Sequence, residues 1–286
     1  MFNIARLTFW EVTRKKVFLV TILLSLAFLL LYGIALHFTA QEIVRMKAMG
    51  QSQLMIQQVV GNQILGAGLY FASFLLALLA LLASVGSIAS EIENGLLHAI
   101  VSKPIKRREI VLGKFIGYGS MLAAYAMILY GGILGLNWYY NAISLTFLSP
   151  ARTIYGALIF ILQPLVLLSV AMVCSTLVRT LTAGIISTIL FGLAMVGGFL
   201  EQIGNLVGKT TLVNIGIATS LVMPSDALFR KLLSVVAGSD VNPLSSLSLG
   251  PFGVAVPPSN AMLVYTCLYI LGGIGLAIYN FNQKDL

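Results

Sequence analysis

Long apolar runs without charge dominate the pattern of hydrophobic and polar positions along this chain. An α-helix needs about 20 residues to cross a bilayer core of roughly 30 Å. The runs that reach this length contain no Asp, Glu, Lys or Arg, and they cover residues 17–38, 66–90, 115–138, 153–178, 181–200 and 261–279. Strands of a membrane barrel would alternate polar and apolar positions, and these runs do not. The pattern therefore predicts an all-α integral membrane protein with six transmembrane helices.

The composition supports this interpretation. Of the 286 residues, 59% are hydrophobic and 9% are charged, whereas soluble domains average about a quarter charged. This balance excludes an ordinary soluble enzyme, a disordered chain and a nucleic-acid-binding domain, so no nucleic acid partner is expected. We expect a single transmembrane domain over residues 1–286, in contact with membrane lipid, as a multi-pass protein of the cytoplasmic (cell) membrane.

Basic residues set the expected orientation. The chain has a net charge of +8, and most of its 17 lysines and arginines fall inside if the N-terminus is cytoplasmic. The positive-inside rule then places both termini in the cytoplasm. Residues 1–16 mix aromatic and basic side chains and are expected to form an interfacial segment, with a cytoplasmic extension of the first span as the alternative. The proline at 164, inside the fourth run, predicts a kink.

Two segments are expected on the outer face. Residues 201–260 form the longer outer loop, and their apolar stretch at 212–223 favours a re-entrant or interfacial helix before the last span. Residues 204–210 resemble a phosphate-binding loop but have three residues between the glycines instead of four, so we interpret them as a plain loop. Residues 39–65 contain Met46, Met49 and Met55, which could bind copper but more often fill apolar gaps, so no metal site is expected.

The spans so drawn hold no ionisable residue apart from His37 at a span end. Ion-coupled transporters and membrane enzymes usually place ionisable groups inside the membrane, so both classes are disfavoured. The two cysteines, Cys174 and Cys267, lack metal or disulfide spacing. If the protein moves a substrate, its energy is expected to come from another chain.

The densest polar stretch covers residues 90–114 and lies between the second and third spans, on the expected inner side. Glu91 and Glu93 stand where the second span leaves the membrane, and Gly95 can break that helix. Apolar residues at 96, 97, 100 and 101 predict a short amphipathic helix that faces a partner or the membrane surface. A solvated loop that obeys the positive-inside rule is the alternative.

This stretch resembles the cytoplasmic loop of ABC type 2 exporter permeases. That family has roughly E-x-E-x-G-T-L, an apolar run, and S-x-P-[VI]-x-R-x-x-[IL]-x-x-G-K. The matching positions are Glu91, Glu93, Gly95, Leu97, Ser102, Pro104, Ile105, Arg107, Ile110, Gly113 and Lys114. Leu96 replaces the usual Thr, and His98 stands where a polar or acidic residue is common. Residues 224–228, PSDAL, and the terminal FNQKDL also resemble family patterns.

In that family the loop is a coupling helix that docks on an ATPase subunit. The resemblance implies that the coupling loop, residues 91–114, contacts a separate ATP-binding ATPase, present in two copies, beside a second permease copy in a homo- or heterodimer. ATP and magnesium would bind the ATPase, and this chain would carry no cofactor, metal or catalytic residue. The expected coupling residues are Glu91, Glu93, Gly95, Leu97, Pro104 and Arg107.

Each of these residues has an expected role. The acidic pair would meet the ATPase, the glycine and the proline would shape the loop, and Arg107 would anchor it. The resemblance therefore predicts an exporter permease that converts ATP hydrolysis on another chain into transport. A non-transport membrane scaffold or assembly factor, with the same spans and no ATPase partner, is the alternative.

Overall fold

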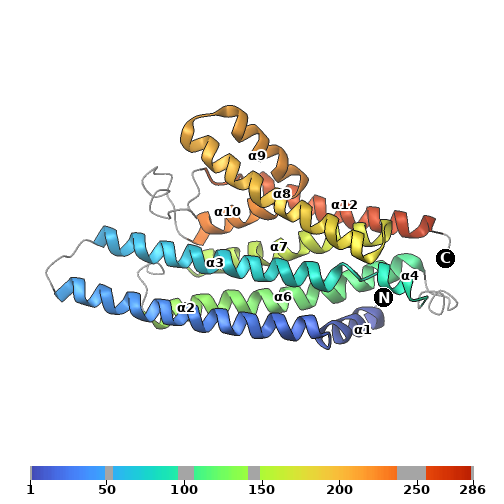
Figure 1. The fold of residues 1–286 in the computed structure, drawn as a ribbon, viewed down its shortest axis with the longest axis horizontal. Helices are drawn as coiled ribbons and strands as arrows, with labels where there is room; N and C mark the ends of the chain where they lie inside the picture. Colours follow the sequence, from blue (N-terminus) through green and yellow to red (C-terminus); the bar gives the residue numbers. More distant parts are fainter. Residues whose placement is uncertain (1, 49–53, 96–105, 141–148, 237–255, 285–286) are drawn as a thin grey trace.

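A computed structural model describes residues 2–48, 54–95, 106–140, 149–236 and 256–284. Within these ranges the regular elements are α-helices. The long ones are α2 (Lys16–Ala48), α3 (Leu54–Ser84), α6 (Arg107–Tyr139), α7 (Pro150–Leu177), α8 (Thr180–Val207) and α12 (Ala261–Gln283). They run lengthwise beside one another in one elongated bundle (Figure 1). Six helices of the described chain are long and apolar enough to cross a membrane, which confirms the six predicted spans.

The helices extend beyond the apolar runs that predicted them. α2 and α3 continue into the segment expected to lie outside, and α8 continues past residue 200 to Val207. α7 runs unbroken across Pro164, so this proline does not divide the fourth span. Hydropathy identifies the part of a helix that is apolar enough to lie in lipid. Backbone hydrogen bonds allow the helix to continue beyond this part through polar residues.

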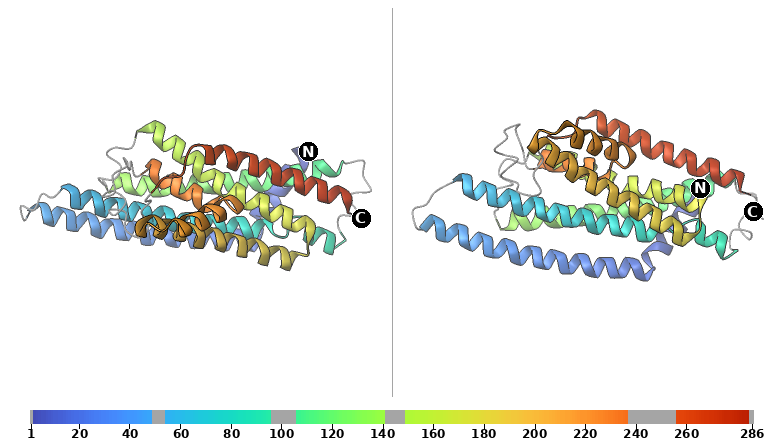
Figure 2. Two further views of the ribbon diagram at one scale, coloured as in Figure 1. Left: turned by 90° about the horizontal axis from the view of Figure 1, so that it is seen from above. Right: turned by 45° about the horizontal axis from the view of Figure 1, so that its top comes forward.

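Both ends of the chain lie at the same end of the bundle, next to the short helix α4 (Ala89–Glu93), as Figures 1 and 2 show. An even number of spans produces this arrangement. The assignment of that end to the cytoplasm stays a prediction.

The N-terminal residues form α1 (Phe2–Thr13), which is separated from α2 by a turn. Ala5, Thr8 and Val12 are buried on one side of α1, and Trp10 is exposed on another. The buried side packs on α6 where Gly117 leaves room, since a Cβ there would lie 2.7 Å from the Ala5 carbonyl and the Thr8 side chain. The N-terminus is therefore a separate helix docked on the bundle, and its interfacial position stays a prediction.

Residues 201–236 are mostly helical, unlike the outer loop expected from their glycines and serines. Gly208 ends α8 in a left-handed conformation, with φ of 71°, and α9 (Thr210–Val222) then packs back along α8. α10 (Ser225–Val236) follows at an angle of 105° to α9, as a broken span or a re-entrant pair. Of the residues that resemble a phosphate-binding loop, 204–207 belong to the end of α8 and Thr210 begins α9, so the plain loop expected there is reduced to a two-residue turn. A phosphate-binding loop would instead follow a strand.

α3 and α7 form the centre of the bundle, whereas α2 and α12 lie at its flanks (Figure 2). In the most apolar window of each helix, 67% of α3 and α7 is buried against 17% of α2 and α12. Leucines such as Leu23, Leu30 and Leu271 are more than half exposed on the flanks. These flanks suit contact with lipid or with another chain, because water would be a poor solvent for them.

Candidate functional site

Four of the predicted coupling residues lie together at the end of the bundle that holds both termini. They are Glu91 and Glu93 in α4, Gly95 just after it, and Arg107 at the start of α6. Leu97 and Pro104 lie outside the described residues, as does the predicted amphipathic helix. The structure therefore describes the two attachments of the coupling loop, one through α4 and one through α6.

The first turn of α4 is attached to α7 through a serine. Ser175 Oγ accepts hydrogen bonds from the backbone N–H groups of Ile88 at 3.1 Å and Ala89 at 2.8 Å. Ser175 is fully buried, and α4 has no capping side chain of its own at its N-cap residue Ile88. A side chain from another helix thus satisfies N–H groups that a helix start leaves unpaired.

The middle of α4 is attached to α6 through a buried ion pair. Glu91 Oε2 lies 2.5 Å from Lys114 Nζ, which also donates a hydrogen bond to the Ser87 carbonyl. The side chains are 19% and 6% exposed, so water screens this pair weakly. Lys114 was part of the matched motif but had no predicted role, because sequence alone does not show that it is buried.

The end of α4 is attached to α8. Glu93 accepts hydrogen bonds from the Thr180 backbone N–H at 2.9 Å and from its hydroxyl at 3.0 Å. A carboxylate at the first residue of a helix also meets the positive end of the helix dipole. Both predicted acidic residues therefore bind helices of their own chain, and their expected contact with an ATPase stays a prediction.

Gly95 has φ of 67°, in the left-handed region that favours glycine. The helix of the second span, α3, already ends at Ser84, and Gly95 instead follows the short helix α4, which ends at Glu93. Gly95 thus places a turn within the coupling loop, directly after α4.

The other attachment of the coupling loop is Arg107. Its Nη1 donates hydrogen bonds to the carbonyls of Phe281, Asn282 and Lys284, at 3.3, 3.2 and 2.6 Å. These carbonyls lie at the C-terminal end of α12, where a helix dipole is negative. The guanidinium thus ties the exit of the loop to the last helix.

The N-terminal helix is tied to the same end of α6. Lys15 lies 3.1 Å from Glu11 and 3.4 Å from the Tyr118 hydroxyl. Burial alone would lower the pKa of Lys15, but its interactions with Tyr118 and Glu11, hydrogen bonds included, outweigh burial and raise this pKa above its usual value. Lys15 therefore stays protonated and bound at neutral pH.

A second group of charged residues, which the sequence interpretation missed, lies between α8 and α10. Arg230 donates hydrogen bonds to Glu201 at 2.7 Å, to Asp226 at 2.9 Å and to the Ser220 hydroxyl at 3.2 Å. The Arg230 side chain is only 2% exposed. The four-residue spacing of Asp226 and Arg230 is the signal in the sequence, but the glycines, serines and prolines of residues 201–260 favour an outer loop there.

The long apolar helices define a multi-pass α-helical membrane protein. Residues 2–286 match the family described as ABC-2 family transporter protein, and the chain belongs to that family. A stretch of 60 residues is 40% identical to the probable ABC transporter permease protein NosY of Stutzerimonas stutzeri, and equally to that of Pseudomonas aeruginosa. This stretch covers 21% of the chain and 22% of each relative, so only about a fifth of the relatives' length is matched.

Proposed function

We propose that this chain is the permease subunit of an ABC exporter in the cytoplasmic membrane, driven by ATP hydrolysis on a separate subunit. The family and the name of its relatives support a transporter permease. Both termini and the coupling loop then lie in the cytoplasm. Two ATPase copies bind ATP and magnesium, and two permease copies, identical or related, enclose the pathway.

One observation supports the coupling role most directly, namely the attachment of α4 to three different helices. Ser175, Lys114 and Thr180 hold it to α7, α6 and α8 respectively. A movement of the coupling loop against an ATPase would therefore act on several spans at once. In a scaffold these contacts would have no comparable use, which favours the permease over the alternative.

The first experiment is purification of the tagged full-length chain together with the ATPases of its cell. We expect a nucleotide-binding chain to co-purify and its ATPase activity to depend on the permease in lipid nanodiscs. Recovery of the intact membrane protein without any nucleotide-binding partner would instead favour the scaffold.

The second experiment compares two left-handed glycines. Gly95 and Gly208 have φ of 67° and 71°, so an alanine at either strains the backbone by a similar amount. Gly95→Ala is expected to lower permease-dependent ATPase activity severalfold, because it alters the entry to the coupling loop. Gly208→Ala, at the α8–α9 turn, is the matched control and should keep that activity. Equal activity of the two variants would contradict the role of the loop.

A further inference from the structure

The charged group between α8 and α10 carries more negative than positive charge. Asp226 and Glu201 share the single guanidinium of Arg230. The next residue, Lys231, donates its hydrogen bond to the Pro258 carbonyl at 3.0 Å instead. The group therefore has one excess negative charge when all three residues are ionised. The Glu201 and Asp226 side chains are 13% and 15% exposed, and excess charge with so little hydration is costly, so it calls for a positive partner.

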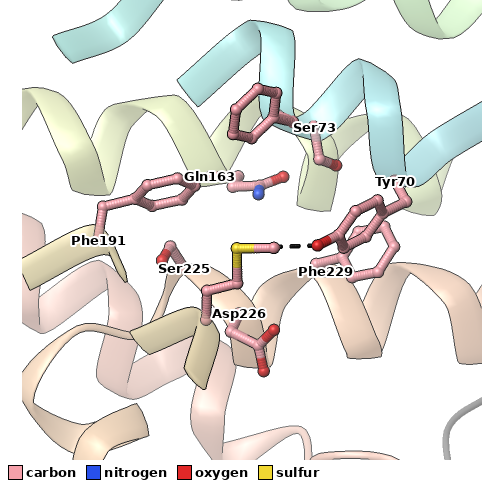
Figure 3. Close-up of a pocket in the computed structure, with 9 residues that line it drawn as sticks. Tyr70, Ser73, Gln163, Phe191, Ser225, Asp226 and Phe229 are labelled. Atoms are coloured by element: carbon pink, nitrogen blue, oxygen red, sulfur yellow. Dashed lines mark hydrogen bonds between the residues drawn. The ribbon is translucent and has the colours of Figure 1, made fainter. Parts of the chain in front are cut away.

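A small cavity lies directly beside Asp226, between α3, α7, α8 and α10 (Figure 3). Its volume is about 30 Å³, enough for a water molecule or a bare ion and too small for an organic substrate. Four aromatic residues form part of its wall, and the polar residues of the wall are Ser73, Gln163, Ser225 and Asp226, besides Tyr70.

Three oxygen atoms in this wall have no hydrogen-bond partner among the residues that the structure describes. They are Ser73 Oγ, Gln163 Oε1 and Ser225 Oγ. Their residues are 4%, 5% and 1% exposed, so bulk water does not reach them. An unpaired buried acceptor costs about 1–3 kcal/mol, which makes three such atoms in one small space exceptional. Figure 3 shows Ser73 and Gln163 on one side of this space and Ser225 and Asp226 on the other.

We propose that this cavity binds one monovalent alkali metal cation. The hydroxyls of Ser73 and Ser225 and the amide oxygen of Gln163 are its ligands, and Asp226 supplies the charge. Hard cations prefer such oxygen ligands. A monovalent ion balances the excess charge, whereas a divalent ion would overcompensate it. The bound ion joins α10 to the central helices α3 and α7.

The test uses the purified full-length chain in detergent at pH 8. Na⁺ or K⁺ replaces N-methylglucamine at constant ionic strength while the thermal unfolding midpoint is measured. We expect a saturable rise of the midpoint with an alkali cation, and binding of about one radioactive sodium ion per chain.

Variants locate the site. Gln163→Leu is expected to raise the half-saturating cation concentration at least tenfold, and Asp226→Asn to remove the response. Ser225→Ala should weaken the response severalfold. Ser234→Ala is the matched control on α10, because Ser234 donates to the Lys231 carbonyl and does not line the cavity. Gln163→Leu keeps the test decisive if Asp226→Asn does not fold.

Three results would overturn the proposal. The first is equal stabilisation by N-methylglucamine and alkali cations. The second is a midpoint that responds to acidification alone, which would mean that a proton on Asp226 balances the charge. The third is an unchanged cation response in folded Gln163→Leu. None of these measurements involves an ATPase, so they are independent of the proposed coupling role.

Discussion

Lys114 is a lysine that the fold keeps out of water, held between Glu91 and the Ser87 carbonyl. Burial of two opposite charges gives little net stability, but removal of one partner leaves the other charge unpaired. The value of this contact therefore depends on both residues being present.

Lys114→Met is expected to destabilise the protein by about 3 kcal/mol, because the Glu91 carboxylate then loses its partner. The double variant Lys114→Met, Glu91→Leu should recover most of this loss. The measurement is the unfolding midpoint in detergent. The exposed pair Arg45–Glu42, whose side chains are 69% and 57% exposed, is the control, and Arg45→Met should cost less than about 1 kcal/mol. Equal losses in the two pairs would show that the Lys114 pair is not buried.

Gly198 lies where α8 passes close to Asp226. A Cβ at this position would overlap the Asp226 carboxylate, whereas a Cβ at Gly192 on the same helix would meet no atom of the described chain within 4 Å. Gly198→Ala is therefore expected to cost about 1–3 kcal/mol through overpacking. Gly192→Ala should be neutral or stabilising, since alanine favours the helix by about 1 kcal/mol. Thermal unfolding of both variants is the measurement, and equal midpoints would contradict the contact.

At the scale of elements, α4 depends on its neighbours because five residues are too few for an isolated helix to be stable. Its stability comes from side chains of α6, α7 and α8. This dependence explains why the coupling loop cannot be understood from its own residues alone.

Ser175→Ala is expected to free the N–H groups of Ile88 and Ala89 and to loosen α4, at a cost of about 1–3 kcal/mol. Amide hydrogen exchange of residues 88–93 should become faster. The matched control is Ser169→Ala, a buried serine of α7 whose hydroxyl donates within its own helix to the Val166 carbonyl. Unchanged exchange in Ser175→Ala would mean that other contacts hold α4.

Hydropathy predicted the six spans, because lipid strongly restricts the residue types of a membrane-spanning helix. The partners of Glu91, Glu93 and Arg107 were not predictable, because they come from α6, α8 and α12, far apart in the sequence. The charged residues of α10 favour a loop when only the sequence is considered, whereas α10 is an amphipathic helix whose apolar side is buried.

At the scale of the whole molecule, the common end of both termini makes the topology testable. In a background without Cys174 and Cys267, we expect a cysteine at Arg6 to be labelled only from the cytoplasmic side. A cysteine at Lys209, in the turn between α8 and α9, should be labelled from the outside. An impermeant maleimide on intact cells and on inverted vesicles gives both results. Labelling of both positions from the same side would contradict an outer α8–α9 turn.

The contacts around α4 also limit how this end of the molecule can move. Ser175, Lys114 and Thr180 hold one attachment of the coupling loop, and the end of α12 holds the other through Arg107. Because of these contacts, a force on the loop can move few of the helices independently of the others. It must carry α6, α7, α8 and α12 along together or break a specific polar contact, so the response approaches two discrete states instead of a graded bend.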